Sequence, residues 1–141
     1  MISVAPASLR GLVPALVTPF MADDPGRIDE RALARLVERA HRRGAAAIAV
    51  CGSTGEAPAL SAAEHARIIA CAVEAAHGAM PVIAGVGAPC TETAVALAVA
   101  AERCGAAMLL ASAPPYSKPG QAGLRAHIRA VASATGLAVM L

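Results

Sequence analysis

Five short apolar segments recur along this chain, and each begins within a few residues of a glycine. Successive segments lie about 30 residues apart, which is the length of one strand and helix unit. Their apolar character is nearly continuous, as in strands that are buried on both faces of a parallel sheet. The segments are residues 12–17, 47–50, 81–84, 107–110 and 137–141. The spacing therefore predicts five parallel strands joined by right-handed crossovers.

Helical patterns fill the intervals between these segments. In the first, apolar residues recur at helical spacing from about Asp29 onward. The second opens with a capping box, in which Ser61 and Glu64 satisfy each other's free N–H groups. The expected helices cover about residues 29–42, 61–78, 91–104 and 121–135. His65 and His127 fall on two of these helices, where we expect them to pack or to cap.

Strands that alternate with helices form either a (β/α)₈ barrel or an open, doubly wound sheet. The 141 residues fit one α/β domain, residues 1–141. A barrel needs eight units and about 250 residues, so this chain would be a partial TIM barrel, with about four and a half βα units that end after strand five. A five-stranded flavodoxin-like sheet would be complete at this length. The strand pattern alone leaves both architectures open.

The composition argues against several functions. The net charge is +2, with scattered arginines and two aromatic residues, Phe20 and Tyr116, so no nucleic-acid partner is expected. Every apolar stretch is interrupted before it reaches the roughly 18 residues of a membrane span, and no secretory leader is evident. We therefore expect a cytoplasmic protein without a membrane partner.

Metals, disulfides and nucleotide cofactors are not expected either. The four cysteines are widely spaced, with no Cys-x-x-Cys pair, and are expected to be buried and reduced. No phosphate-loop ending is present, and the Gly85-Val86-Gly87 segment lacks the third glycine of a dinucleotide-binding turn. The sequence thus predicts neither a metal nor a cofactor.

Chemistry-bearing residues follow the expected strands. Gly52-Ser53-Thr54-Gly55-Glu56 comes directly after the second strand. Two glycines allow a tight turn, and successive N–H groups with two hydroxyls can bind a small anion such as a carboxylate. The alternative is an ordinary strand-to-helix loop. In either architecture the carboxyl ends of parallel strands carry the ligand site.

Four segments, taken in order, resemble the dihydrodipicolinate synthase and N-acetylneuraminate lyase family. They are Thr18-Pro19-Phe20, Gly52 to Glu56, Ala84-Gly85-Val86-Gly87 and Tyr116-Ser117-Lys118-Pro119. The resemblance runs the whole length of the chain, and the last segment is more similar to the synthase branch. It implies a lyase on a (β/α)₈ barrel, a pyruvate-dependent class I aldolase.

The resemblance also implies roles for three residues. The N–H groups of Ser53 and Thr54, with the Thr54 hydroxyl, would bind the pyruvate carboxylate. Ser53 would pass a proton toward Tyr116, which in this family reaches the site of a neighbouring subunit, so a homo-oligomer is expected. The alternative for Tyr116 is a loop tyrosine packed on Pro115 and Pro119. The implied substrates are pyruvate and an aldehyde such as aspartate semialdehyde.

The family's covalent step uses a lysine at the end of strand six, which forms a Schiff base with pyruvate. The one lysine of this chain, Lys118, follows the fourth expected strand and is expected to be a surface or anion contact. Two hypotheses follow: the N-terminal part of a pyruvate-dependent lyase of lysine biosynthesis, or a catalytically inactive fragment or paralogue that acts at most as a binding module. A partial barrel would leave strand edges open, so we expect the isolated chain to dimerise or to be insoluble.

Overall fold

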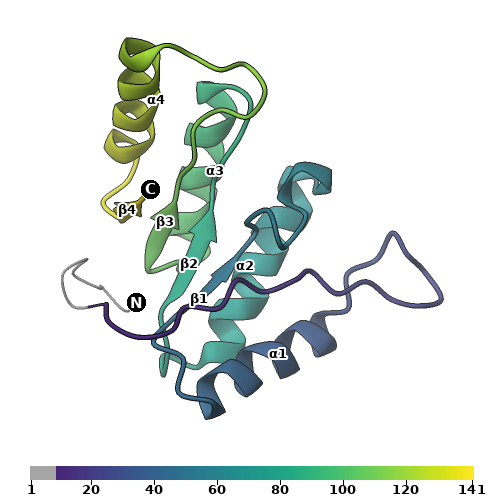
Figure 1. The fold of residues 1–141 in the computed structure, drawn as a ribbon. Coiled ribbons are helices and arrows are strands. Elements are labelled where there is room, and N and C mark those ends of the chain that lie inside the picture. Colours follow the sequence, from purple (N-terminus) through teal and green to yellow (C-terminus); the bar gives the residue numbers. More distant parts are fainter. Residues whose placement is uncertain (1–8) are drawn as a thin grey trace.

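The computed structural model describes residues 9–141 and contains one parallel sheet with helices on one side of it (Figure 1). The strands are β1 (Ile48–Val50), β2 (Val82–Gly85), β3 (Met108–Leu110) and β4 (Ala138–Met140). The helices are α1 (Glu30–Arg42), α2 (Ala62–Ala76), α3 (Thr91–Arg103) and α4 (Gln121–Ser133), with a short 3₁₀ helix, η2 (Ala57–Ala59). The predicted alternation of strand and helix is confirmed.

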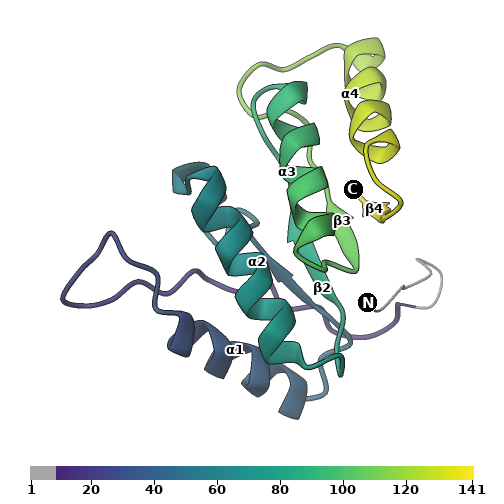
Figure 2. The same ribbon diagram turned by 180° about the vertical axis from the view of Figure 1, so that it is seen from behind.

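The strand order decides between the two architectures. The sheet runs β1-β2-β3-β4, so each strand lies beside the next one in the chain. Figure 2 shows α1, α2 and α3 in front of the strands, and α4 packs against α3. A doubly wound sheet would reverse its strand order and carry helices on both faces. Sequential order with one helical face is the arrangement of a (β/α)₈ barrel, so the partial barrel is confirmed and the open flavodoxin-like sheet is excluded.

The first expected strand, residues 12–17, is present as an extended segment and not as a member of the sheet. Three backbone hydrogen bonds join it to β1 and the residues before it: Ala46 N to Leu12 O, Ala49 N to Pro14 O and Leu16 N to Ala49 O, each between 2.9 and 3.0 Å. Pro14 lies in the middle of this pairing and has no N–H to donate. The ladder is therefore interrupted, and only the Ala15 to Ala49 bridge remains.

The helix boundaries follow the expected capping signals. Asp29 caps α1, because its carboxylate accepts a hydrogen bond of 2.8 Å from Ala32 N. The capping box of α2 is present, with Ser61 N donating to Glu64 Oε2 at 2.8 Å and Glu64 N donating to Ser61 Oγ at 3.3 Å. This helix ends slightly before the expected position, because His77 already adopts a left-handed conformation at the C-cap.

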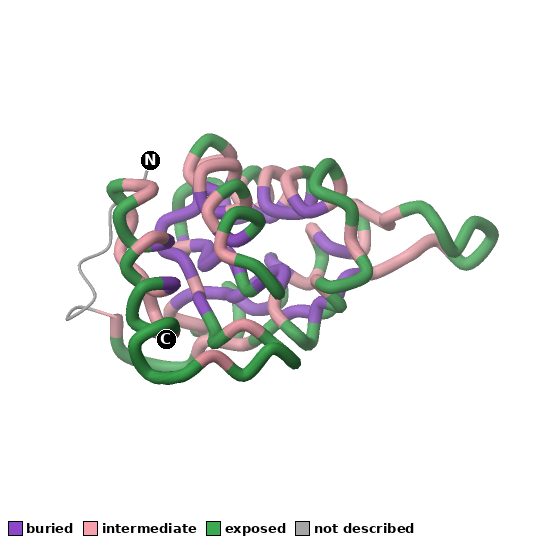
Figure 3. The backbone as a smooth tube through the Cα atoms, turned by 90° about the horizontal axis from the view of Figure 1, so that it is seen from above, coloured by how far each residue is buried: buried purple, intermediate pink, exposed green. Residues whose placement is uncertain are grey.

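Strands β1 and β2 are buried on both faces, as the apolar runs predict, whereas β4 is only partly buried. Ile48 and Val50 of β1 belong to the core between the sheet and the helices, whereas Ala49 belongs to a smaller cluster on the opposite face with Ile83 and Met108. Figure 3 shows the buried segments in the interior, with exposed loops around them. The strand ends are thus held on a rigid, closely packed support.

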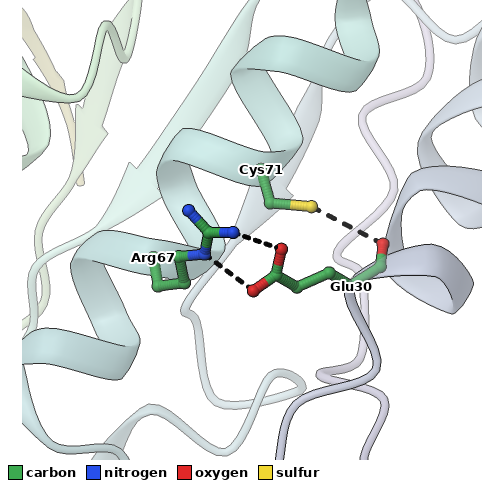
Figure 4. A network of polar contacts seen from close by, with 3 residues as sticks. All are labelled: Glu30, Arg67 and Cys71. Atoms are coloured by element: carbon green, nitrogen blue, oxygen red, sulfur yellow. Dashed lines mark hydrogen bonds and ion pairs between the residues drawn. The ribbon is translucent and has the colours of Figure 1, made fainter.

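An ion pair ties α1 to α2 across the outer surface (Figure 4). Arg67 donates from Nε and from one terminal nitrogen to the two Glu30 carboxylate oxygens, both at 2.7 Å. The Arg67 side chain lowers the pKa of Glu30 through these hydrogen bonds. The Cys71 thiol donates to the Glu30 carbonyl at 3.6 Å. Because the pair is largely exposed, it orients the two helices more than it stabilises them.

The cysteines are all free, as expected, but their burial differs. Cys51 is buried and Cys71 and Cys104 are partly buried, whereas Cys90 is exposed, so the expectation of a buried thiol is wrong there. Cys90 occupies the N-cap of α3, where the chain leaves the sheet edge. Within residues 9–141, no helix is long and apolar enough to cross a bilayer, and no three His, Cys, Asp or Glu residues are grouped to hold a metal.

Candidate functional site

The Gly52 to Glu56 segment forms a tight turn at the carboxyl end of β1. Cys51 leaves the strand with a left-handed conformation (φ 55°), and Glu56 adopts a similar one (φ 56°) before η2. Gly55 N donates to Gly52 O and Glu56 N donates to Ser53 O, both at 3.1 Å. These bonds close the turn on itself and leave its outer side to solvent.

The N–H groups of Ser53 and Thr54 are free donors of this turn. Both residues are exposed, and no atom of the described residues accepts a hydrogen bond from either N–H. Adjacent unpaired N–H groups make a concave site for an anion. The tight turn predicted from the sequence is present, and the Ser53 and Thr54 N–H groups face solvent; that it binds an anion stays a prediction.

Thr18 holds the turn from the side of the first extended segment. Its hydroxyl donates to Gly55 O at 2.7 Å, and its side chain is 5% exposed. Thr18 is part of the Thr18-Pro19-Phe20 segment, which the sequence places at the same rim. The contact joins residues 37 positions apart and fixes the position of the turn.

Gly85, at the end of β2, approaches the backbone at the entrance to the turn. A Cβ atom at this position would lie 2.1 Å from Cys51 O and 2.9 Å from Gly52 N. Such distances are far shorter than van der Waals contact, so no other residue fits without movement of the backbone. The glycine noted in the Ala84 to Gly87 segment is thus a close-approach position.

His65 of α2 lies beneath this contact. Its side chain is buried, and Nε2 donates to Gly85 O at 2.7 Å. The Cys51 thiol donates to the His65 carbonyl at 3.8 Å. Within the described residues the other ring nitrogen, Nδ1, is buried without a partner. Burial lowers the pKa of His65, and the hydrogen bond to Gly85 opposes this in part.

Its place on an expected helix predicts only packing or capping for His65. A stronger signal was present: His65 shares a helical face with Ile68, Ile69 and Ala72, all of which are buried. Cys51, the other polar side chain here, is not a nucleophile, because burial raises its pKa to about 12 and leaves the thiol protonated.

A cavity of about 170 Å³ opens beside the turn. It is lined by residues at the ends of β1, β2 and β3 or just beyond them, including Gly52, Ser53, Gly85, Gly87 and Ser112. The carboxyl ends of three strands therefore converge on one site, as the parallel arrangement predicts. Thr54 follows the lining residue Ser53 in the sequence but does not itself line the cavity.

The structure does not bring Tyr116 to Ser53 within one chain. Tyr116 lies on the loop between β3 and α4, its side chain is fully exposed, and it does not pack on Pro115 and Pro119. Tyr116 and Lys118 both adopt left-handed conformations, with φ of 69° and 45°. Residues other than glycine rarely do so, and such strain often marks a functional segment. Lys118 is exposed on the same loop and does not line the cavity.

The stability of the protein should depend on the protonation of His65. Its pKa lies below the ordinary value of 6.5 in the folded state, so between these two values the unfolded chain binds more protons. The contribution is fully present above about pH 6.5 and is lost as the pH falls from there through the folded-state pKa. Urea unfolding at a series of pH values measures this. The His65→Gln variant should show a flatter profile, and an equally steep profile would contradict the expectation.

Comparison with known proteins places this geometry in a family. The model of the dihydrodipicolinate synthetase family matches residues 8–141. A 4-hydroxy-tetrahydrodipicolinate synthase of Salinibacter ruber is 44% identical over 132 residues, which cover 94% of this chain and 43% of the relative. The enzyme of the same name from Methanococcoides burtonii is 43% identical over 132 residues, which cover 94% of this chain and 44% of that relative. The chain thus spans less than half the length of these curated relatives.

Solved structures agree with the sequence comparisons. Dihydrodipicolinate synthase from Aquifex aeolicus superposes with a TM-score of 0.86 at 41% identity, covering 92% of this chain and 43% of that one. The chloride-inhibited dihydrodipicolinate synthase from Acinetobacter baumannii, solved in complex with pyruvate, gives a TM-score of 0.88 at 39% identity and covers 94% and 45%. Both superpositions cover more than nine-tenths of this chain.

Proposed function

Because this chain belongs to the dihydrodipicolinate synthetase family, we propose that its turn at Gly52 to Glu56 binds the carboxylate of pyruvate in a lyase of the 4-hydroxy-tetrahydrodipicolinate synthase type. The observation that carries this proposal is the pair of unpaired N–H groups at Ser53 and Thr54. They lie beside a cavity at the carboxyl edge of the sheet. The pyruvate complex of the Acinetobacter baumannii relative adds support from outside this chain.

The remaining roles follow from the family. The Thr54 hydroxyl would add a hydrogen bond to the carboxylate, and Ser53 would pass a proton toward Tyr116. Because Tyr116 is fully exposed, it is free to reach the site of a neighbouring subunit in a homo-oligomer. The second substrate would be an aldehyde such as aspartate semialdehyde, in cytoplasmic lysine biosynthesis. Residues 1–141 would then form a single domain, the barrel as far as its fifth strand.

Binding of pyruvate tests the proposal. Titration of the ¹⁵N-labelled chain with pyruvate should shift the amide signals of Ser53 and Thr54 before others. Removing one hydrogen bond to a charged group in Thr54→Val should weaken the affinity by about tenfold. The matched control is Ser117→Ala, which removes an exposed hydroxyl from the loop after β3. Shifts confined to that loop, or an unchanged affinity in Thr54→Val, would contradict the proposal.

A second candidate is a binding module without aldolase activity. It is favoured by the position of Lys118, the one lysine of these 141 residues, which is exposed on a loop and does not line the cavity. A class I aldolase forms a Schiff base between a lysine amine and the pyruvate ketone. Under our proposal that lysine is not supplied by this chain, so the residues present here bind and orient pyruvate.

Trapping with borohydride separates the two chemistries. When the chain is mixed with pyruvate and reduced, we expect no covalent adduct in the intact mass, because Lys118 is exposed on a loop and does not line the cavity beside the turn. The full-length Salinibacter ruber relative, treated in parallel, is the positive control. An adduct that disappears in Lys118→Arg would assign the covalent role to this chain and overturn the expectation.

A further inference from the structure

We propose that His65 is a positioning residue for the carboxylate-binding turn, an inference that rests on the proposed function of that turn. The imidazole does not reach the cavity, and His65 is not one of its lining residues. It acts on the backbone that carries the two free N–H groups. Three contacts, taken in order, make the connection.

The first contact fixes the end of β2. His65 Nε2 donates to Gly85 O at 2.7 Å, and both partners are buried. A buried hydrogen bond of this length, made by the first buried side chain of α2, sets the position of the Gly85 peptide. Removal of the donor would leave the Gly85 carbonyl without a side-chain partner and free to shift.

The second contact transmits that position to the turn. Gly85 lies against the peptide that joins Cys51 to Gly52, so closely that a Cβ atom would overlap it. The next N–H along the chain is that of Ser53. A displacement of Gly85 by a few tenths of an ångström therefore changes the surface on which the turn rests.

The third contact acts on Cys51 directly. The Cys51 thiol donates to the His65 carbonyl, so one residue of α2 touches the ends of both β1 and β2. Cys51 holds a left-handed conformation, which persists in a non-glycine residue only where its surroundings enforce it. This contact is made by the His65 backbone carbonyl, so it places α2 against the bend that starts the turn and does not depend on the imidazole.

Simple packing does not account for an imidazole at this position. Within the described residues His65 Nδ1 has no partner, which carries a desolvation cost that an apolar side chain would avoid. His127 of α4 offers a matched comparison, because it is also buried with one unpaired ring nitrogen. Its Nδ1 contacts Thr91 Oγ1 at the start of α3 and not the turn.

The test compares variants at the two buried histidines, with and without pyruvate. In His65→Leu the amide signals of Gly52, Ser53 and Thr54 should move in the absence of ligand, and the dissociation constant for pyruvate should rise about tenfold. His65→Gln keeps a side-chain N–H donor and should restore most of the affinity. His127→Leu should lower stability while the turn signals and the affinity stay close to those of the unmodified protein.

The possible outcomes are distinct. If His65→Leu does not fold, His65→Met, which is unbranched and lacks a donor, takes its place. The inference is overturned when the turn signals stay in place in the folded donor-free variant, or when His127→Leu weakens binding equally. If the unmodified chain does not bind pyruvate, the proposed function fails, while the ligand-free amide signals still decide whether His65 positions the turn.

Discussion

Replacement of Gly85 with alanine should destabilise the protein by on the order of 3 kcal/mol, enough to remove much of the stability of a typical domain. The added Cβ would lie 2.1 Å from Cys51 O and 2.6 Å from Cys51 C. Both obstructing atoms are backbone, so no side chain can rotate away to make room. The end of β2 or the start of the turn must move, and the hydrogen bond of His65 with Gly85 O would be strained in either case.

Gly52→Ala is the matched control for this prediction. It adds the same methyl group only one residue beyond Cys51, yet nothing lies within 4 Å of the new atom, and Gly52 does not need a left-handed conformation. Urea unfolding followed by circular dichroism compares the two variants. Equal unfolding midpoints for Gly85→Ala and Gly52→Ala would show that the close approach of the two backbones does not constrain the protein.

Replacement of Thr18 with valine should lower the free energy of unfolding by about 1–3 kcal/mol and also weaken the binding of pyruvate. Valine has the same shape but no hydroxyl, so the buried Gly55 carbonyl loses its 2.7 Å hydrogen bond. The turn would then keep its contact with Gly85 but lose its hydrogen bond to the Thr18 side chain. The Ser53 and Thr54 N–H groups would be less well ordered in the absence of ligand. Because binding would then have to order them, the affinity for pyruvate would be lower.

Thr18→Ser keeps the hydroxyl and loses only a methyl group, so it should retain most of the affinity. Chemical denaturation gives the stability of both variants, and calorimetric titration with pyruvate gives their affinities. Thr18→Val would contradict the structure if it lost no more stability than Thr18→Ser. Loss of stability with full retention of affinity would limit Thr18 to a structural role.

The local elements could be predicted from the sequence because their signals are local. The apolar runs marked β1 to β4, and Asp29 and the Ser61 capping box marked where α1 and α2 begin. The same reasoning placed the Gly52 to Glu56 turn directly after a strand. The apolar pattern also predicted a full strand over residues 12–17, which is wrong. Hydrophobicity does not show that Pro14 interrupts the backbone pairing.

The candidate site was predictable only in part. That Thr18 and Gly85 would lie near the turn followed from parallel strands, whose carboxyl ends share one edge. Their contacts did not follow, since the pairing of Val50 with Ala84 and of Gly85 with Leu110 depends on register. A shift of one residue would turn every side chain of a strand to the other face. The burial of His65 could have been predicted from its helical face, but its contact with Gly85 O could not, because that contact depends on how α2 packs on β2.

The sequence by itself determined that this chain is built from alternating strands and helices and that a tight, glycine-containing turn follows its second apolar run. Periodicity and capping act within about one helix or strand and need no knowledge of the rest of the fold. The tertiary structure alone decided the sequential strand order and the full exposure of Tyr116. It also decided the enclosure of the turn by Thr18, Gly85 and His65. These features depend on contacts between residues 20 or more positions apart, and such contacts form only when the whole sheet and its helices pack together.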